Sequence, residues 1–433
     1  MRSMPIAGRP WYPGYVLLLL AMANILNAVD RTLVSLLAEL IKQDMGISDT
    51  QLGILTGFAF AVFFVLAGIP IARWADRGNR RTILALGIGL WSLMTAVFGL
   101  GTGFTMLVIA RIGVGIGEAA AVPTSMSLIA DYFSPGKRTR AVSVFQSAVF
   151  LGLVLTAVAG FIAHQYGWRT AFVAAGAIGV VLSCVVYFTL AEPARGSFDP
   201  AGEGTRVPPP LWESVRVLLS KPVYVLVLVA MATSAVSSAS LSAWGAAFLI
   251  RVHSFNVAEV AGVVGPASGI GGFLGSLTGG FLTTYLVNRT GERRWTLLIP
   301  GIALVLAVPT VLVFLLTESG TLALAAFGLQ AFLWSIKTGP LFALAMELVR
   351  PSLRAFAVAV LIVTAGIVGN GIGPLLVGVL SDYFGSSGAS LPIRYALILV
   401  PVFLLVAAGA LLTAARVWRE QGTPAVSSTA SAS

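Results

Sequence analysis

The strongest constraint on the fold is a series of apolar stretches, each about as long as a bilayer is thick. Residues 15–29, 52–72, 83–99 and 295–316 are clear examples. A helix needs about 20 apolar residues to cross ~30 Å of hydrocarbon. The 433-residue chain is 57% hydrophobic and 10% charged, whereas soluble domains carry about 25% charged residues. Because these runs are continuously apolar and do not alternate between apolar and polar residues, they favour helices over a membrane β-barrel.

Twelve segments of suitable length fit the chain, so we predict an all-α membrane protein. An even number of spans places both ends of the chain on one side of the bilayer. The expected spans are 14–40, 51–73, 82–103, 105–131, 141–166, 169–190, 222–250, 257–287, 295–316, 320–349, 355–383 and 392–417.

A short motif recurs half a chain length later, which indicates two related halves. An acid, a proline, an arginine and an alanine share an offset of 216 residues: Asp131 and Glu347, Pro135 and Pro351, Arg138 and Arg354, Ala141 and Ala357. Secondary transporters are commonly built from such repeats, with the substrate site between them. We therefore predict two pseudo-symmetric halves: an N-terminal six-helix bundle at 1–190, a cytoplasmic linker at 191–221, a C-terminal six-helix bundle at 222–418 and a disordered C-terminal tail at 419–433.

The net charge of +10 is explained by membrane topology. The side that holds both termini carries 20 of the 27 Lys and Arg residues. The remaining seven are Lys42, Arg169, Arg251 and Arg394 on the other side, and Arg31, Arg111 and Lys337 within spans. Positive residues concentrate on the cytoplasmic side of membrane proteins. We expect a multi-pass protein of the plasma membrane (the inner membrane of a Gram-negative cell) with both termini cytoplasmic, and no nucleic-acid partner.

Five charged residues fall inside the expected spans: Asp30, Arg31, Arg111, Glu118 and Lys337. Each needs a reason, because a charge at the bilayer centre costs from about 2.5 to more than 10 kcal/mol. One interpretation is a static ion-pair network that holds the first half together. The other is functional: Asp30 and Glu118 carry protons, while Arg31, Arg111 and Lys337 hold an anionic headgroup. Lys337 could instead extend its ammonium to the membrane surface.

The loop after the second span carries a motif of its own. It runs from Ala72 through Asp76, Arg77, Arg80 and Arg81, and it resembles the loop of the major facilitator superfamily. This chain departs from the superfamily pattern at two glycines, where it has Ala72 and Asn79, and the equivalent second-half stretch has Thr284 in place of the aspartate. The resemblance implies the major facilitator fold and a cytoplasmic gate formed by Asp76, Arg77, Arg80, Arg81, Asp131 and Arg138.

Further motifs resemble the spinster branch of that superfamily. They are Asn27-Ala-Val-Asp30-Arg31, Asp49-Thr-Gln-Leu-Gly-Ile-Leu, Gly115-Ile-Gly117-Glu118-Ala119 and Glu192-Pro-Ala-Arg195-Gly196. This resemblance implies alternating-access export of lysolipids or phosphorylated sphingoid bases, with proton coupling in some members. In addition, the four-residue step from Arg111 to Gly115 resembles the superfamily's proton-coupling motif.

Several polar and aromatic residues could line a central cavity: Asn27, Phe60, Phe64, Trp244, Trp334 and Asn370. The aromatic residues could grip an acyl chain, but packing is the commoner role for any one of them. Gly271, Gly275 and Gly279 recur every four residues, and they predict a close helix-packing face in span 8.

The sequence argues against several other functions. It has no metal-ligand cluster, nucleotide-binding loop or nucleophile triad, so we expect neither an enzyme nor a cofactor or bound metal. We expect a monomer that lies in the lipid bilayer and binds a small amphiphilic substrate and protons. The main alternative is a proton-coupled drug or organic-anion antiporter, although the glycine–proline pair typical of antiporters is absent from 150–160. A channel or a non-transporting receptor is a more distant alternative.

Overall fold

The structure is a computed structural model that describes residues 9–195, 211–349 and 353–421. The described residues form helices and connecting loops, with no strand among them. Twelve helical segments are long and apolar enough to cross a membrane: Tyr12–Leu36, Asp49–Ala75, Arg80–Gly99, Phe104–Tyr132, Arg140–Tyr166, Trp168–Thr189, Pro222–His253, Val257–Thr290, Trp295–Leu316, Gly320–Glu347, Phe356–Ser386 and Pro392–Trp418. The predicted all-α class with twelve spans is therefore confirmed.

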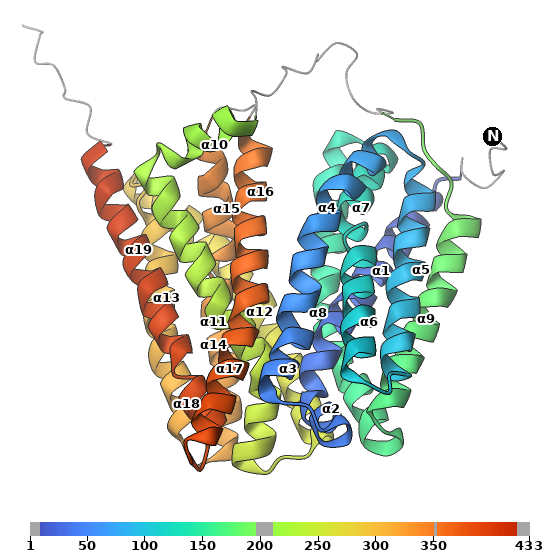
Figure 1. The fold of residues 1–433 in the computed structure, drawn as a ribbon. Helices are drawn as coiled ribbons and strands as arrows, with labels where there is room; N and C mark the ends of the chain where they lie inside the picture. The colour runs from blue at the N-terminus through green and yellow to red at the C-terminus, as the bar shows by residue number, and fades with distance from the viewer. Residues whose placement is uncertain (1–8, 196–210, 350–352, 422–433) are drawn as a thin grey trace, which may run out of the picture.

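Helices of the first half lie together on the right of Figure 1. They are α1 (Tyr12–Leu36), α2 (Ala38–Met45), α3 (Asp49–Gly53), the π-helical segment η1 (Ile54–Phe58), α4 (Ala59–Arg77), α5 (Arg80–Gly99), α6 (Phe104–Glu118), α7 (Ala121–Tyr132), α8 (Pro135–Tyr166) and α9 (Trp168–Thr189). The first span was predicted too long. It ends at Leu36 because Leu37 leaves helical geometry, and the charged α2 follows as a separate short helix.

Helices of the second half lie on the left of Figure 1. They are α10 (Leu211–Leu219), α11 (Pro222–His253), α12 (Val257–Thr290), α13 (Trp295–Leu316), α14 (Gly320–Ser335), α15 (Thr338–Glu347), α16 (Arg354–Thr364), the π-helical segment η3 (Ala365–Ile372), α17 (Gly373–Ser386), α18 (Pro392–Ala396) and α19 (Leu399–Gln421). Residues 196–210 of the predicted linker and 422–433 of the predicted tail lie outside the described residues, and the domain boundaries stay a prediction.

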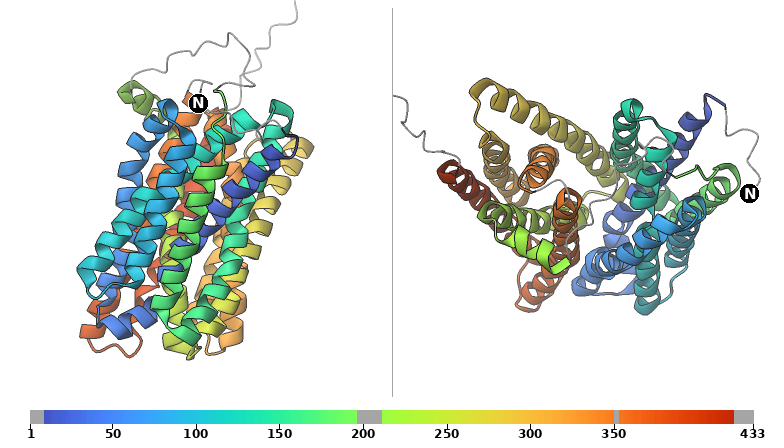
Figure 2. Two further views of the ribbon diagram at one scale, coloured as in Figure 1. Left: turned by 90° about the vertical axis from the view of Figure 1, so that its right-hand side faces the viewer. Right: turned by 90° about the horizontal axis from the view of Figure 1, so that it is seen from above.

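The two ends of the molecule are distinguished by short helices. Helix α10 lies at one end, and α2 and α18 lie at the other (Figure 1). We call these the α10 end and the α2–α18 end. The two halves stand side by side (Figure 2), and they contact each other where α8 packs on α12 and where α3 and η1 meet α17 and η3.

Polar residues cap the helices where spans begin. Ser48 accepts from the backbone N–H of Gln51 at the start of α3, and Asn256 accepts from that of Glu259 at the start of α12. Asn79 caps α5 in the same way. The first N–H groups of a helix have no partner inside it, so such residues mark helix starts in the sequence.

The glycine ladder of span 8 is a close packing face, as the sequence predicts. A Cβ added to Gly271 would lie 3.0 Å from the carbonyl oxygen of Gly328, and one added to Gly275 would lie 2.9 Å from the carbonyl carbon of Phe332. A Cβ on Gly279 would lie 2.7 Å from the carbonyl carbon of Ile336. The absence of side chains therefore lets α12 approach the backbone of span 10 directly.

This packing face gives a stability prediction with a matched control. Gly279→Ala forces the backbone of Ile336 to move, so we expect it to lower the free energy of unfolding by about 1–3 kcal/mol. Gly280→Ala adds the same methyl group one residue later, where nothing lies within 4 Å, and we expect it to be neutral. Thermal unfolding of both variants in detergent checks this. Equal melting temperatures would contradict the packing argument.

Candidate functional site

The centre of the first half holds an ion pair between two spans. Arg31 of α1 donates from Nε to Oε2 of Glu118, the last residue of α6, at 2.7 Å. The Glu118 side chain is fully buried, whereas the Arg31 side chain is 38% exposed. The sequence left open which acid would meet which arginine, and the structure brings these two together. The arginine is therefore the accessible member of the pair.

Two stacked aromatic rings flank the arginines. Phe60 and Phe64 have ring centroids 5.5 Å apart. The Arg31 guanidinium carbon lies 5.0 Å from the centroid of Phe60 and 4.7 Å from that of Phe64, and the guanidinium of Arg111 lies 5.1 Å from that of Phe60. A cation over an aromatic face is stabilised by about 0.5–2 kcal/mol. These rings therefore help to orient the two guanidinium groups.

Arg111 and Asp30 are buried beside the ion pair. Arg111 is 3% exposed and donates from Nε to the carbonyl oxygen of Leu55 at 3.0 Å. Asp30 is 4% exposed, within electrostatic reach of Glu118 and Arg111, and it forms no ion pair with any residue that the structure describes. Neighbouring residues on a helix point about 100° apart. This is why Asp30 and Arg31 have different surroundings.

Lys337 lies apart from this cluster, between α14 and α15 of the second half. It is 2% exposed, so its ammonium does not extend to the surface. Its Nζ lies 3.7 Å from the ring centroid of Trp334, and the indole of Trp334 donates to the carbonyl oxygen of Ser234 at 3.1 Å. Within the described part of the chain, Lys337 has no ion pair.

The other expected cavity residues differ in accessibility. Trp244 is 1% exposed and donates to the carbonyl oxygen of Pro374 at 2.9 Å, so it joins α11 to α17. Asn27 is buried, and Asn370 of η3 is exposed. A cavity-lining role for this set stays a prediction.

At the α10 end, Arg80 organises a polar cluster within the first half. It is 1% exposed, it contacts Asp131, and it donates to Glu192 at 2.7 Å and to the carbonyl oxygen of Pro193 at 2.9 Å. Glu192 also accepts from the backbone N–H of Arg81. The sequence had not assigned Glu192 to this cluster. Its position in the motif that follows span 6 was the available signal.

The remaining expected gate residues are Asp76, Arg77 and Arg138. Arg138 donates to the carbonyl oxygen of Ala130 at 2.8 Å, and Arg77 is exposed. The side chain of Asp76 lies outside the described residues. The contacts described here lie within one half, and the predicted cytoplasmic gate stays a prediction.

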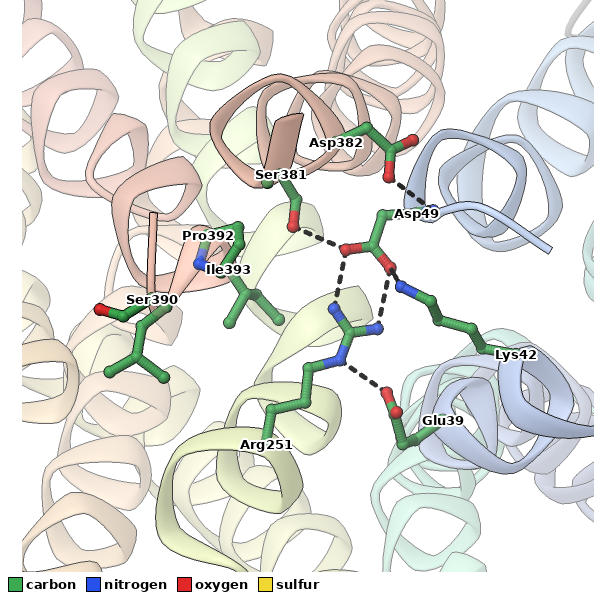
Figure 3. Close-up of a pocket in the computed structure, with 11 residues that line it drawn as sticks. Glu39, Lys42, Asp49, Arg251, Ser381, Asp382, Ser390, Pro392 and Ile393 are labelled. Carbon is green, nitrogen blue, oxygen red and sulfur yellow. Dashed lines mark hydrogen bonds and ion pairs between the residues drawn. The ribbon is translucent and has the colours of Figure 1, made fainter. Parts of the chain in front are cut away.

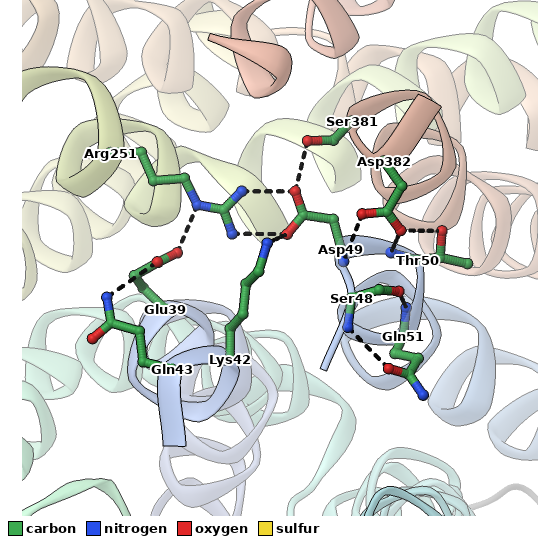
Figure 4. A network of polar contacts seen from close by, with 10 residues as sticks. All are labelled: Glu39, Lys42, Gln43, Ser48, Asp49, Thr50, Gln51, Arg251, Ser381 and Asp382. Atoms are coloured by element: carbon green, nitrogen blue, oxygen red, sulfur yellow. Dashed lines mark hydrogen bonds and ion pairs between the residues drawn. The ribbon is translucent and has the colours of Figure 1, made fainter. Parts of the chain in front are cut away.

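At the α2–α18 end, ion pairs join the two halves (Figure 4). Arg251, near the end of α11, donates two hydrogen bonds to the carboxylate of Asp49, at 2.7 and 2.9 Å, and a third to Glu39 at 2.6 Å. Asp49 also accepts from Lys42 at 2.5 Å and from the hydroxyl of Ser381 at 2.6 Å. A planar guanidinium with two carboxylate partners is a strong, directional contact.

A second carboxylate crosses the same interface. Asp382 of α17 accepts from the backbone N–H groups of Asp49 and Thr50, at 3.1 and 2.8 Å, and from the Thr50 hydroxyl at 2.6 Å. A cavity of about 560 Å³ opens beside these residues, between α2, α11, α17 and α18 (Figure 3). We call Glu39, Lys42, Asp49, Arg251, Ser381 and Asp382 the outer latch.

The sequence alone does not indicate that these residues meet. Arg251 and Lys42 entered the topology argument, and Asp49 entered a family motif, but nothing joined them. Partners 202 residues apart, such as Arg251 and Asp49, cannot be paired from helical periodicity.

A comparable ion pair at the same end lies within one half. Arg169 of α9 contacts Asp44 of α2, and both side chains are partly exposed, at 40% and 44%. The hydrogen bond from Arg169 lowers the pKa of the Asp44 carboxyl from its ordinary value. This pair does not cross between the halves, so it provides a control for the outer latch.

Comparisons with known proteins identify the class. Residues 20–368 match the Major Facilitator Superfamily, and the chain belongs to that family. It is 34% identical over 90% of its length to an MFS-type efflux pump of Mycolicibacterium smegmatis, of which 89% is covered. It is 29% identical over 90% of its length to the sphingosine-1-phosphate transporter SPNS2 of Danio rerio, of which 81% is covered.

A solved structure shares the whole fold. A bacterial homologue of the human lysosomal transporter Spinster, crystallised in an inward-facing and unoccupied conformation, matches with a TM-score of 0.84 and 30% identity. The match covers 96% of this chain and 100% of that one. The protein is thus a major facilitator superfamily transporter of the Spinster type, as the sequence motifs predicted.

Proposed function

We propose that this transporter is proton-coupled and moves an amphiphile with an anionic, phosphate-bearing headgroup by alternating access. The observation that carries this proposal is the ion pair between a partly exposed arginine and a buried acid, Arg31 and Glu118. An anionic headgroup that reaches Arg31 must compete with Glu118 for the same guanidinium.

Competition for Arg31 provides a coupling mechanism. When Glu118 is charged, it neutralises Arg31. When Glu118 accepts a proton, its attraction for the guanidinium weakens, and the planar fork of Arg31 can bind two oxygens of a phosphate. Arg111 and Asp30, buried beside this pair, add a second cation and a second candidate proton carrier.

The outer latch supports an alternating cycle. The ion pairs of Arg251 with Glu39 and Asp49 join the two halves at the α2–α18 end. The few basic residues assigned to the non-cytoplasmic side, including Lys42, Arg169 and Arg251, belong to helices or helix ends there. We infer that this end faces away from the cytoplasm and that it is closed in this structure. During transport, the 1–190 and 222–418 bundles would rock against each other.

The relatives support two classes of solute. SPNS2 of Danio rerio is named for a phosphorylated lipid, which agrees with a partly exposed arginine at the centre of the first half. The Mycolicibacterium smegmatis relative is an efflux pump, so export of drug-like solutes is the second candidate. The two candidates can be distinguished by the charge of the solute, because Arg31 attracts an anionic headgroup and repels a cationic drug.

A flux assay tests the proposal. We expect proteoliposomes under an imposed proton gradient to take up a phosphate-bearing lysolipid several-fold faster than proteoliposomes without the gradient. They should take up a sugar no faster than protein-free vesicles do. A gradient response confined to a cationic dye would replace the lipid proposal with drug efflux. Specific binding without flux of any solute would instead indicate a receptor.

A further inference from the structure

The start of the second span, Asp49–Ala75, is capped by both halves of the protein. The first N–H groups of a helix have no acceptor within it. Ser48 accepts from the N–H of Gln51 at 3.2 Å. The two preceding N–H groups, of Asp49 and Thr50, donate to Asp382 of the other half. One span of the first half therefore has a complete cap only while the second half lies against it (Figure 4).

Asp382 has a different role from the neighbouring carboxylate of Asp49. Asp49 pairs with the cations Arg251 and Lys42. In the described part of the chain, Asp382 pairs with no cation; it accepts hydrogen bonds from the backbone N–H groups of Asp49 and Thr50 and from the Thr50 hydroxyl. A carboxylate is stabilised at a helix N-terminus by these N–H groups and by the helix dipole. The stabilisation that Asp382 provides therefore depends on the position of the start of span 2.

Small residues set the distance at which this contact forms. A Cβ on Gly378 of α17 would lie 3.1 Å from the Cα of Thr50, and one on Gly53 would lie 2.9 Å from the Cα of Leu375. The two helices are thus in backbone contact. Since hydrogen bonds weaken quickly beyond about 3.2 Å, a small separation of α17 from α3 breaks all three bonds to Asp382.

We propose that Asp382 is a positioning residue of the transport cycle: it holds the start of span 2 against α17, and it thereby stabilises the state closed at the α2–α18 end. When the halves part there, the N–H groups of Asp49 and Thr50 must turn to water, and the carboxylate loses its donors. Loss of the Asp382 charge shifts the population toward the state open at that end. This rests on alternating access but on neither the solute nor the proton.

Reactivity of a buried cysteine measures the shift. Ala61 of α4 is 2% exposed, and it lies between the halves, 3.6 Å from where a Cβ on Gly371 of η3 would be. Ala61→Cys is placed on a Cys184→Ala background, which removes the single native cysteine. We expect Asp382→Asn to raise its rate of reaction with a water-soluble maleimide in detergent at least several-fold.

Three further variants make the result decisive. Asp44→Asn removes a carboxylate that pairs within the first half, and it should leave the rate unchanged. Arg251→Ala breaks the ion pairs across the interface and should raise it. Thr50→Val removes one donor to Asp382 and keeps every charge, so it should raise the rate less than Asp382→Asn, and it decides the question if Asp382→Asn does not fold.

The outcomes separate this inference from the proposed function. Faster labelling with Arg251→Ala but not with Asp382→Asn or Thr50→Val would overturn the role of Asp382 and leave alternating access intact. Unchanged labelling in Arg251→Ala, Asp382→Asn and Thr50→Val, with transport still measurable, would overturn both the role of the outer latch in closing this end and this inference. A rise with Asp44→Asn equal to that with Asp382→Asn would show that any lost carboxylate at this end loosens the protein, which also overturns the specific role.

Discussion

We expect Glu118→Gln to reduce gradient-driven transport to the level of protein-free vesicles, while the protein stays close to wild type in thermal stability. Glutamine keeps the size of Glu118 and an oxygen that can accept from Nε of Arg31, but it cannot take up a proton. The measurement is uptake into proteoliposomes with and without an imposed proton gradient, beside melting temperature in detergent. Solute exchange without a gradient should persist, because it does not require a net movement of protons.

A purely structural ion pair behaves differently. Breaking a buried pair by removing one partner is expected to cost about 3–5 kcal/mol, so stability and transport would then fall together. Glu259→Gln serves as the matched control, because Glu259 lies in the exposed capping box of α12, where glutamine caps equally well. A stable Glu118→Gln protein that still responds fully to the gradient would remove Glu118 from the coupling mechanism.

The second large effect concerns Arg31 and separates the two solute classes. Arg31→Ala should weaken binding of a phosphate-bearing amphiphile at least 100-fold, since charge-assisted hydrogen bonds contribute about 1.5–3 kcal/mol each and about 1.4 kcal/mol is tenfold in affinity. Arg31→Lys keeps the charge and loses the fork, so about a tenfold loss is expected. A cationic dye should bind Arg31→Ala as well as or better than wild type.

The Arg31→Ala experiment needs a control for Glu118, which loses its ion-pair partner. Arg31→Ala leaves Glu118 buried and without its cation, which can destabilise the protein. The double variant Arg31→Ala with Glu118→Gln removes both charges, and it should show the same loss of amphiphile binding at fixed pH. If either protein folds and binds the anionic amphiphile as tightly as wild type, Arg31 does not hold the headgroup.

The sequence predicted the fold well because the bilayer imposes a local rule. An unsatisfied backbone is too costly in hydrocarbon, so each crossing is a helix whose length is set by membrane thickness. The twelve spans follow from this rule. The predicted end of span 1 was wrong, because the rule does not specify where a helix ends once the apolar run stops. Leu37 leaves helical geometry where the apolar run of α1 gives way to the charged α2.

The candidate site was predictable in its members but less so in its pairings. The cost of a buried charge singled out Asp30, Arg31, Arg111, Glu118 and Lys337, and all but Arg31 prove to be almost fully buried. The sequence could not say that Phe60 and Phe64 lie against guanidinium groups, because that contact depends on how α1, α4 and α6 pack.

By itself, the sequence determined the number of spans, the superfamily and which charges must leave water, since each follows from composition, length or a contiguous motif. The tertiary structure alone decided that Glu118 takes Arg31 as its partner and that Asp382 caps a span 332 residues away in sequence. Such pairings depend on distances between helices that no local period encodes. Under the proposed alternating access they also belong to one conformation, because the hydrogen bonds of the outer latch exist only while the two halves meet at that end.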